Sequence, residues 1–271
     1  MKKQKTLGGS VFVHNAIEFD YCIAESLSSL CAVCDEVVAA DAESTDETID
    51  LLRYVREKNA NLLIVEGLKW DANDDFHRLS RLANAAMSFL KTDWHFMLQA
   101  DEVIHESSFE AIRNAVQNDC GLKSFFCRRV NLYGDLDHCL RFDLPQSKKP
   151  CSDEIIRLAT IDNKAFSDAE SLRVDPKHLS RMFCEKILIF HYGFVRRDRQ
   201  FIEKVNDMQS WFQGAGSIVD PRIAGMSCVG EFDWRKFFDE SDLMQIPSSH
   251  PFFSTHWAEA RQLSKPFKVK P

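Results

Sequence analysis

The sequence predicts an α/β protein with a mostly parallel sheet flanked by helices. Apolar runs of strand character alternate with segments of helical periodicity up to about residue 100, and two of these runs end directly at an aspartate, Asp41 and Asp101. The chain has 271 residues, of which 45% are hydrophobic, so it can bury one large core. Strands that alternate with helices are typical of parallel sheets that bind ligands where the strands end.

The elements of the first half follow one another in regular order. Apolar residues recur at helical spacing in the helical segments and run on continuously in the strands. Ser44 and Glu47 have the spacing of a capping box, which predicts a helix that begins at about Thr45. The predicted elements are a strand at 11–13, a helix over 20–34, a strand at 36–40, a helix over 45–57, a strand at 62–65, a helix over 74–91 and a strand at 94–100.

The alternation weakens after about residue 107. A proline- and lysine-bearing stretch at 143–150 predicts a loop. We expect residues 107–195 to complete the same domain and residues 196–271 to form a helical extension. The predicted elements of this part are a helix over 108–118, strands at 124–133, 154–159 and 186–190, and a helix over 198–213.

Charge and composition exclude several classes of protein. The net charge of −7 and a pI near 5.7 disfavour nonspecific binding to nucleic acid or to anionic membranes. No apolar run is long enough to span a bilayer, and the first residues lack the apolar block of a secretion signal, so we expect a cytoplasmic protein. The nine cysteines are scattered, with Cys31 and Cys34 as one close pair, and we interpret them as reduced thiols.

Asp101 is the first candidate for a functional residue. It follows the apolar run 94–100 and is itself followed by Glu102. A carboxylate at the carboxyl end of a buried strand lies where open α/β sheets place their ligands, and hard divalent cations prefer such oxygens. The alternative is an ordinary turn or cap residue.

Asp41 ends an earlier apolar run, 36–40, in a similar way. The predicted helix after it would direct unpaired amide N–H groups toward the loop 41–44, which suits a nucleotide or a phosphate. A carboxylate at this position can accept hydrogen bonds from the N–H or O–H groups of a nucleoside. The alternative is that Asp41 only caps the helix or shapes the loop.

These segments, taken in order, resemble sequence blocks of family 2 glycosyltransferases. The resemblance is carried by VFVHNAIEFDYCIAESLSSL, DEVVAADAESTDET and RLANAAMSFLKTDWHFMLQADE, and it covers about residues 10–106. It implies a GT-A type, Rossmann-like fold, a nucleotide-sugar donor, with UDP-sugars ahead of others, and Mn²⁺ or Mg²⁺ as cofactor. It also implies that residues 1–106 form the nucleotide-sugar-binding half and residues 107–195 an irregular acceptor-binding half.

The resemblance implies roles for individual residues of the first half. Asp101 takes the position of the metal ligand, whereas Gln99 replaces the first acid of the usual motif and so puts a donor-sugar or ribose contact in doubt. Asp41 takes the position that contacts the nucleoside. Asn15 is a candidate for the same nucleotide, with a turn former as the alternative. Arg81 lies near the family's Arg- or Asn-bearing position, displaced by two residues, and a solvated helix surface is its alternative.

A second set of candidates follows the apolar run 186–190. His191 ends that run and is followed by Gly193 and then by basic residues. A neutral imidazole would complete the coordination of the metal, while Arg196 and Lys204 would neutralise a diphosphate. Related glycosyltransferases carry a similar stretch, which is why we assign these roles. The alternative for His191 is a histidine that packs at the end of a core strand.

The resemblance further implies a carboxylate base, because the family mostly inverts the anomeric centre. Asp153 and Glu154, which open the predicted strand at 154–159, are our candidates, and Asp135 and Asp137 compete with them. Each of these acids is otherwise a loop residue.

The sequence thus predicts a metal-dependent glycosyltransferase that acts on a glycan, a lipid-linked intermediate, a protein or a modified nucleobase. One alternative is a degenerate member that binds a nucleotide-sugar without transferring it, for which Gln99 is the direct hint. The other is a glycosyltransferase that acts on a modified DNA base. The basic residues Lys123, Arg128, Arg129, Lys148 and Lys149 would serve that activity, but the net charge opposes it.

Overall fold

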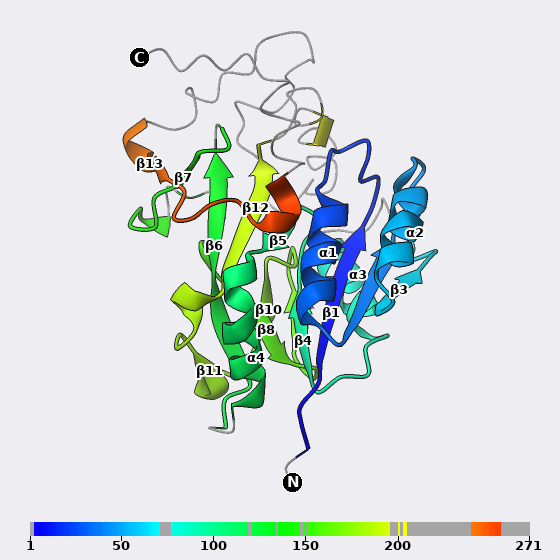
Figure 1. Ribbon diagram of the computed structural model, residues 1–271, viewed down its shortest axis with the longest axis horizontal. Helices are drawn as coiled ribbons and strands as arrows, with labels where there is room; N and C mark the ends of the chain where they lie inside the picture. Colours follow the sequence, from blue (N-terminus) through cyan, green and yellow to red (C-terminus); the bar gives the residue numbers. More distant parts are fainter. Residues whose placement is uncertain are drawn as a thin grey trace.

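The computed structural model describes residues 3–70, 77–118, 121–133, 135–146, 149, 151–195, 200, 203–204 and 240–255. An 11-stranded sheet runs through them, and helices cover it (Figure 1). Among these residues, no helix combines the length and the apolar character needed to cross a bilayer.

The first half of the described chain alternates strands and helices, as the sequence predicts. Its elements are β1 (Leu7–Val13), α1 (Ile23–Val33), β2 (Glu36–Asp41), α2 (Thr48–Lys58), β3 (Leu62–Val65), α3 (Arg78–Met87) and β4 (Trp94–Met97). Strands β3, β2, β1 and β4 lie side by side in this order, and each pair is parallel.

The second half extends the sheet with strands of mixed direction. Its elements are β5 (Glu102–Ile104), α4 (Phe109–Gln117), β6 (Ser124–Tyr133), β7 (His138–Leu140), β8 (Glu154–Thr160), β9 (Lys164–Phe166), β10 (Ser171–Arg173), β11 (Leu179–Ser180), β12 (Leu188–Phe194) and β13 (Leu243–Gln245). Strand β8 is antiparallel to both β4 and β6, and β12 is parallel to β6.

Because β8 is antiparallel to both β4 and β6, strands β4 and β6 run in the same direction, and β12 runs with them. The carboxyl ends of β1, β2, β4 and β12 consequently lie at one edge of the sheet, the upper edge in Figure 1. The predicted α/β class with a mostly parallel sheet is confirmed. The antiparallel strand β8 between two parallel sets is an addition that periodicity did not predict.

The core lies on both faces of the parallel strands. Val11 and Val13 of β1 pack with Leu27 and Leu30 of α1, whereas Phe12 points to the opposite face, where α3 and the β9–β10 hairpin cover the sheet. Burial on both faces explains why these strands read as continuous apolar runs. Each such buried side chain contributes about 1.5–3 kcal/mol to folding.

The start of β1 differs from the sequence prediction, and its two glycines explain the difference. Strand β1 begins at Leu7 rather than at residue 11, and its two glycines lie against neighbouring side chains. A Cβ on Gly8 would lie 2.6 Å from Thr92 Oγ1, and one on Gly9 would lie 3.0 Å from Cys34 Sγ. The strand can continue through these positions because neither residue has a side chain.

The predicted capping box is wrong. Helix α2 begins at Thr48, and the Ser44 hydroxyl accepts a hydrogen bond from the Asn15 amide, 2.9 Å away, instead of capping its own helix. Asp46 takes over that function, since its Oδ1 accepts a hydrogen bond from the Thr48 N–H at 3.0 Å. The predicted helix over 198–213 falls almost wholly outside the described residues.

Candidate functional site

The upper edge of the sheet brings together a carboxylate, an imidazole and an ammonium group. Asp101 Oδ1 lies 3.8 Å from His191 Nε2, and Asp101 Oδ2 accepts a hydrogen bond from Lys204 Nζ at 3.1 Å. Asp101 and His191 are buried, with 5% and 7% of their surface exposed. With Asn131, which contacts His191, these residues form what we call the edge cluster: Asp101, Asn131, His191 and Lys204.

Glu102 fixes the turn that presents Asp101. Its Oε2 accepts a hydrogen bond from the backbone N–H of Gln99 at 3.0 Å. Its Oε1 pairs with Arg157 at 2.6 Å and with Arg129 at 3.3 Å, and Glu102 is fully buried. Burial by itself raises the pKa of Glu102, but the two guanidinium groups outweigh it, so the net pKa is lowered and the carboxylate stays ionised.

His191 is the central residue of β12 rather than a residue beyond its end. Burial lowers the pKa of His191 to about 3, although Asp101 opposes the shift, so the imidazole is neutral near pH 7. Its Nδ1 lies 2.9 Å from Asn131 Oδ1. A Cβ on Gly193 would lie 2.4 Å from His191 Nε2 and 3.3 Å from Asp101 Oδ2, so the space beside this pair exists because residue 193 is glycine.

The donor set fits a divalent cation. The 3.8 Å between Asp101 Oδ1 and His191 Nε2 lies between the separations of adjacent ligands, about 3.0 Å, and opposite ligands, about 4.2 Å, on one octahedral ion with bonds of ~2.1 Å, so a small shift of the side chains would let both atoms bind one ion. If His191 Nε2 is the unprotonated nitrogen of the neutral ring, it has no proton to share with the facing carboxylate oxygen, and a cation between them removes the repulsion. Two protein ligands leave positions for substrate oxygens.

Asp41 lies at the same edge, at the end of β2. It is buried, with 4% of its surface exposed, and its Oδ2 accepts a hydrogen bond from the Ser44 amide at 3.2 Å. Its Oδ1 is also buried and has no hydrogen-bond partner among the described residues. An ionised oxygen in that state is costly unless a donor is supplied, and an N–H or O–H group of a ligand would supply it.

Aromatic and basic groups lie next to the Asp41 loop. The rings of His14 and Trp70 stack with 4.2 Å between their centroids, and Trp70 donates its backbone N–H to Glu43 Oε2 at 3.0 Å. The guanidinium carbon of Arg78 lies 4.9 Å from the centre of the Trp70 ring. These contacts hold the segment after β3 against the loops that follow β1 and β2.

The remaining candidates for nucleotide contact occupy different settings. Asn15 joins two loops, since its Oδ1 accepts from the Thr45 amide at 2.8 Å and its Nδ2 donates to Glu18 Oε2 at 2.6 Å. Its φ of 49° is the left-handed conformation of a turn residue, so the geometry favours the turn-former alternative. Arg81 lies on the exposed face of α3, and Gln99 is half-buried in the turn before Asp101. Arg196 lies outside the described residues.

The two candidate bases are both held by cations. Asp153 Oδ2 lies 2.8 Å from Lys149 Nζ and 3.3 Å from Arg128 Nη1. Glu154 Oε1 lies 3.2 Å from Arg128 Nη2, and its other oxygen pairs with Arg181. Both carboxylates already accept charge-assisted hydrogen bonds from these cations, so their contacts favour a structural role, and the base assignment stays a prediction.

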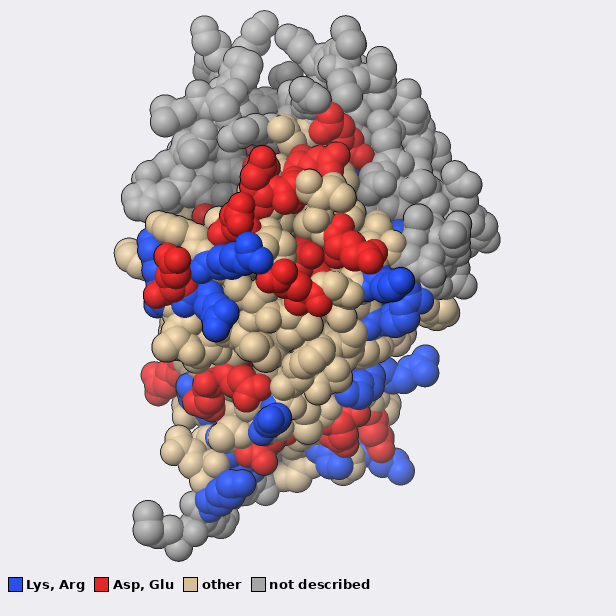
Figure 2. Space-filling model, turned by 90° about the vertical axis from the view of Figure 1, so that its right-hand side faces the viewer, with Lys and Arg blue, Asp and Glu red and all other residues tan. Residues whose placement is uncertain are grey.

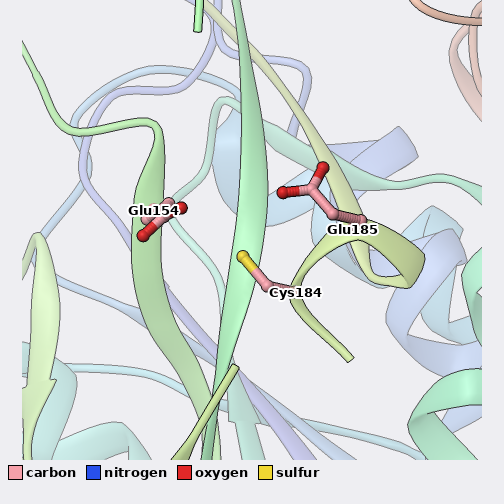
Figure 3. A group of neighbouring side chains, drawn as sticks. All are labelled: Glu154, Cys184 and Glu185. Carbon is pink, nitrogen blue, oxygen red and sulfur yellow. The ribbon is translucent and has the colours of Figure 1, made fainter. Parts of the chain in front are cut away.

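Another group of possible metal ligands lies near the start of β8. Glu154, Cys184 and Glu185 place ligand atoms within 4.8 Å of one another (Figure 3). Both carboxylates are already bound by arginines: Arg128 contacts Glu154 and Glu185, and Arg181 contacts Glu154. We call this set the arginine-bound cluster: Arg128, Glu154, Arg181, Cys184 and Glu185. Burial also raises the pKa of the Cys184 thiol, which disfavours the thiolate that a metal would require.

Acidic side chains gather toward the top of the face shown in Figure 2, which is the end of the molecule where the parallel strands terminate. A rim of carboxylates attracts cations and repels the phosphate backbone of nucleic acid. On this face, the charge of the described residues therefore opposes the DNA-base alternative.

Sequence reasoning missed Asn131 and gave Gly193 no role. Asn131 is one of several polar residues in the buried run SFFCRRVNLY of β6, and its Cα is paired with that of His191 in the sheet register. A polar residue in such a run is an available signal, but its partner becomes visible only when β6 and β12 are known to be neighbours.

Comparison with known proteins gives distant structural likenesses. No family model matches the chain, and no curated relative matches its sequence. TarS of S. aureus in complex with UDP aligns with a TM-score of 0.46 and 14% identity, over 75% of this chain and 64% of that one. The mannosyltransferase PcManGT from Pyrobaculum calidifontis, in complex with GDP-Man and Mn²⁺, aligns with a TM-score of 0.45 and 15% identity, over 81% and 67%.

A third structure is glucosyl-3-phosphoglycerate synthase from Mycobacterium tuberculosis with Mn²⁺, UDP and phosphoglyceric acid. It aligns with a TM-score of 0.42 and 12% identity, over 61% of this chain and 61% of that one. All three structures hold UDP or GDP-Man. The chain spans 64% and 61% of the TarS and synthase structures, which is less than two thirds of each. Likenesses at these scores do not decide an activity, so the case for one rests on the site itself.

Proposed function

We propose that the chain is a GT-A glycosyltransferase that moves a sugar from a nucleoside diphosphate sugar to an acceptor hydroxyl with the help of a divalent cation. The observation that supports it is the convergence of Asp101, His191 and Lys204 at the edge where Asp41 ends β2. This edge thus carries the groups expected for a cation, a diphosphate and a nucleoside, on or next to strands β2, β4 and β12. The sequence resemblance over residues 10–106 supports the same activity.

Asp101 and His191 would hold the cation in this proposal. When bound, the ion would neutralise charge on the diphosphate leaving group as a Lewis acid. A carboxylate combined with an imidazole suits Mn²⁺ better than Mg²⁺, which prefers oxygen ligands. Lys204, already beside Asp101, would hold the diphosphate oxygens by charge-assisted hydrogen bonds.

Asp41 would orient the nucleoside. Its unpartnered Oδ1 accepts hydrogen bonds and cannot donate them while ionised, so it selects groups that donate, such as the imide N–H of uracil, the N–H groups of guanine or a ribose hydroxyl. A UDP-sugar satisfies this requirement, and so does a GDP-sugar. The acceptor would approach from the second half of the chain, as the resemblance implies.

Calorimetry with UDP, GDP and dTDP, each with and without Mn²⁺, tests the proposal. We expect binding of at least one nucleoside diphosphate that is tighter with Mn²⁺ present and is lost in Asp101→Asn. The exposed Asp50→Asn on α2 serves as the control of equal charge change and should bind as the wild type does. Absence of any nucleotide binding to the wild-type protein with Mn²⁺ would refute the proposal.

Turnover of the donor separates transfer from binding alone. An active enzyme hydrolyses its sugar nucleotide slowly even without an acceptor, and the released nucleoside diphosphate can be measured. If the protein binds a donor but never releases the diphosphate, with or without a panel of acceptors, the degenerate binding protein is the correct interpretation.

A further inference from the structure

Asn131 makes a set of contacts that determines the chemical state of His191. It is buried, with 1% of its surface exposed, and its Oδ1 lies 2.9 Å from His191 Nδ1 and 3.2 Å from Cys151 Sγ. Its Nδ2 donates to the carbonyl oxygen of Ser152 at 3.4 Å. The amide is thus in contact on both sides, with the oxygen toward the ring and the NH₂ group toward a carbonyl.

The neighbours of the amide fix its orientation. If the amide were turned over, its oxygen would face the Ser152 carbonyl oxygen and its NH₂ group would face both the thiol and the ring. Burial raises the pKa of the Cys151 thiol to about 12, so the sulfur keeps its proton and acts as a donor. The contacts with Ser152 and Cys151 therefore agree on one orientation, in which Asn131 Oδ1 is the acceptor.

An acceptor at this position requires a proton on His191 Nδ1. A neutral imidazole carries one N–H, so the proton on Nδ1 leaves Nε2 with its lone pair exposed on the ring edge. That nitrogen is the atom 3.8 Å from Asp101 Oδ1, on the side that Gly193 keeps clear of a Cβ. The unprotonated nitrogen thus lies beside the carboxylate.

We propose that Asn131 is a positioning residue that holds His191 as the Nδ1–H tautomer and so presents Nε2 as a ligand to a divalent cation at Asp101. The role toward a cation rests on the proposed function, whereas the tautomer does not. Outer partners of this kind orient metal-binding histidines and raise the basicity of the ligating nitrogen, and their loss typically weakens metal binding 10–100-fold.

Nitrogen NMR of the ¹⁵N-histidine-labelled, metal-free protein near neutral pH tests the tautomer directly. The signal of His191 is identified by its absence in His191→Gln. We expect Nδ1 to show the shift of a protonated nitrogen and Nε2 that of an unprotonated one. The opposite assignment in the wild-type protein overturns the proposal, and this measurement requires neither a change at Asn131 nor a bound metal.

Calorimetric titration with Mn²⁺ tests the consequence. Asn131→Leu removes the acceptor at similar volume, and we expect a 10–100-fold loss of Mn²⁺ affinity together with a mixture of His191 tautomers. Asn61→Leu is the matched control, because Asn61 Nδ2 bonds the carbonyls of Cys31 and Cys34, each at 3.0 Å, at the opposite edge of the sheet. That variant should bind Mn²⁺ as the wild type does.

Asn131→Asp keeps an oxygen toward the ring and provides a second test if Asn131→Leu does not fold. It should preserve the Nδ1–H tautomer and retain Mn²⁺ binding. Unchanged Mn²⁺ affinity and unchanged tautomer in a folded Asn131→Leu would overturn the proposal. If the wild-type protein binds no Mn²⁺ at all, the proposed function and the cation role fail together, while the NMR result still decides the tautomer.

Discussion

The edge cluster brings one carboxylate together with a nitrogen ligand, and the arginine-bound cluster brings two carboxylates together with a sulfur ligand, but the charges around these groups differ. In the arginine-bound cluster, two guanidinium groups contact two carboxylates, and one of those carboxylates, Glu185, has 68% of its side chain exposed. In the edge cluster, the Asp101 carboxylate is only 7% exposed and faces a neutral imidazole. The spacing of ligand atoms is similar in the two, so spacing alone does not distinguish a cation site from a set of ion pairs.

The difference shows that cation binding depends on the groups that contact the possible ligand atoms as much as on the ligand atoms themselves. Arginine cannot lose its proton, so a carboxylate that it binds is already neutralised and gains little from a metal. Among the described residues, Asp101 pairs with the ammonium group of Lys204, which is a compact and flexible charge that can move to a phosphate oxygen. The experiments below test this distinction, beginning with the variant for which we expect the largest effect.

Asp101→Asn should have the largest effect. It removes the anionic ligand while keeping the shape of the side chain, so we expect donor turnover to fall by about 10³-fold, which corresponds to about 4 kcal/mol. Denaturant unfolding should show that the variant remains folded, because Asp101 is at a turn and not in the apolar core. Turnover within tenfold of the wild type would remove Asp101 from the site.

Glu102→Gln should act on stability. It leaves Arg129 and Arg157 buried without their shared anion, and the loss of one partner from a buried ion pair costs about 3–5 kcal/mol. We expect a lower denaturant midpoint, and Glu110→Gln on the exposed side of α4 should leave the midpoint unchanged. Equal stability of the Glu102→Gln and Glu110→Gln variants would show that Glu102, contrary to the role described above, does not stabilise the fold.

Gly193→Ala should affect the edge cluster without changing its charge. The new Cβ would lie 2.4 Å from His191 Nε2, and the ring cannot rotate freely because Asn131 holds its Nδ1. We expect kcat/KM to fall by about 10–100-fold, comparable to the loss of an outer partner of a metal ligand. Measurement of Mn²⁺ affinity together with thermal unfolding distinguishes displacement of His191 from general destabilisation, which would lower the unfolding temperature as well.

Glu185→Gln should have the smallest effect. Glu185 is largely exposed, and Arg128 keeps its contacts with Asp153 and Glu154, so the change should lower the free energy of unfolding by at most about 1 kcal/mol. Mn²⁺ affinity and donor turnover should not change. A loss of Mn²⁺ binding in this variant would reverse the comparison and make the arginine-bound cluster the cation site.

The first half of the fold was predictable because its signals are local. Continuous apolar runs predict β2 and β3 to within a residue. Strand β2 is buried on both faces, whereas β3 lies beside it at the edge of the sheet with Leu63 exposed. The start of α2 was not predictable from the spacing of Ser44 and Glu47, because the Ser44 hydroxyl is taken by Asn15 from another loop. Long-range contacts of this kind leave no periodic signal.

In the candidate site, too, local signals could be read from the sequence, whereas contacts between distant segments could not. Asp101 could be selected because an acid that ends an apolar strand is conspicuous, whereas Asn131 acquires its meaning from a register pair in a neighbouring strand. Asp153 and Glu154 look like free acids in the sequence, but Lys149 and Arg128 approach them only in the folded protein. The position of a charge can thus be read from the sequence, but the charges that compensate it cannot.

The separation of Asp101 and His191 along the chain has a consequence for how the protein assembles. Asp101 and His191 are 90 positions apart along the chain, 191 minus 101, yet two of their side-chain atoms lie 3.8 Å apart. Closing a loop of that length costs about 4 kcal/mol of chain entropy, and such distant contacts form late and slowly. During synthesis, the amino-terminal strands can therefore pair before His191 reaches Asp101. The edge cluster is complete only after β12, one of the last strands in the chain, has joined the sheet.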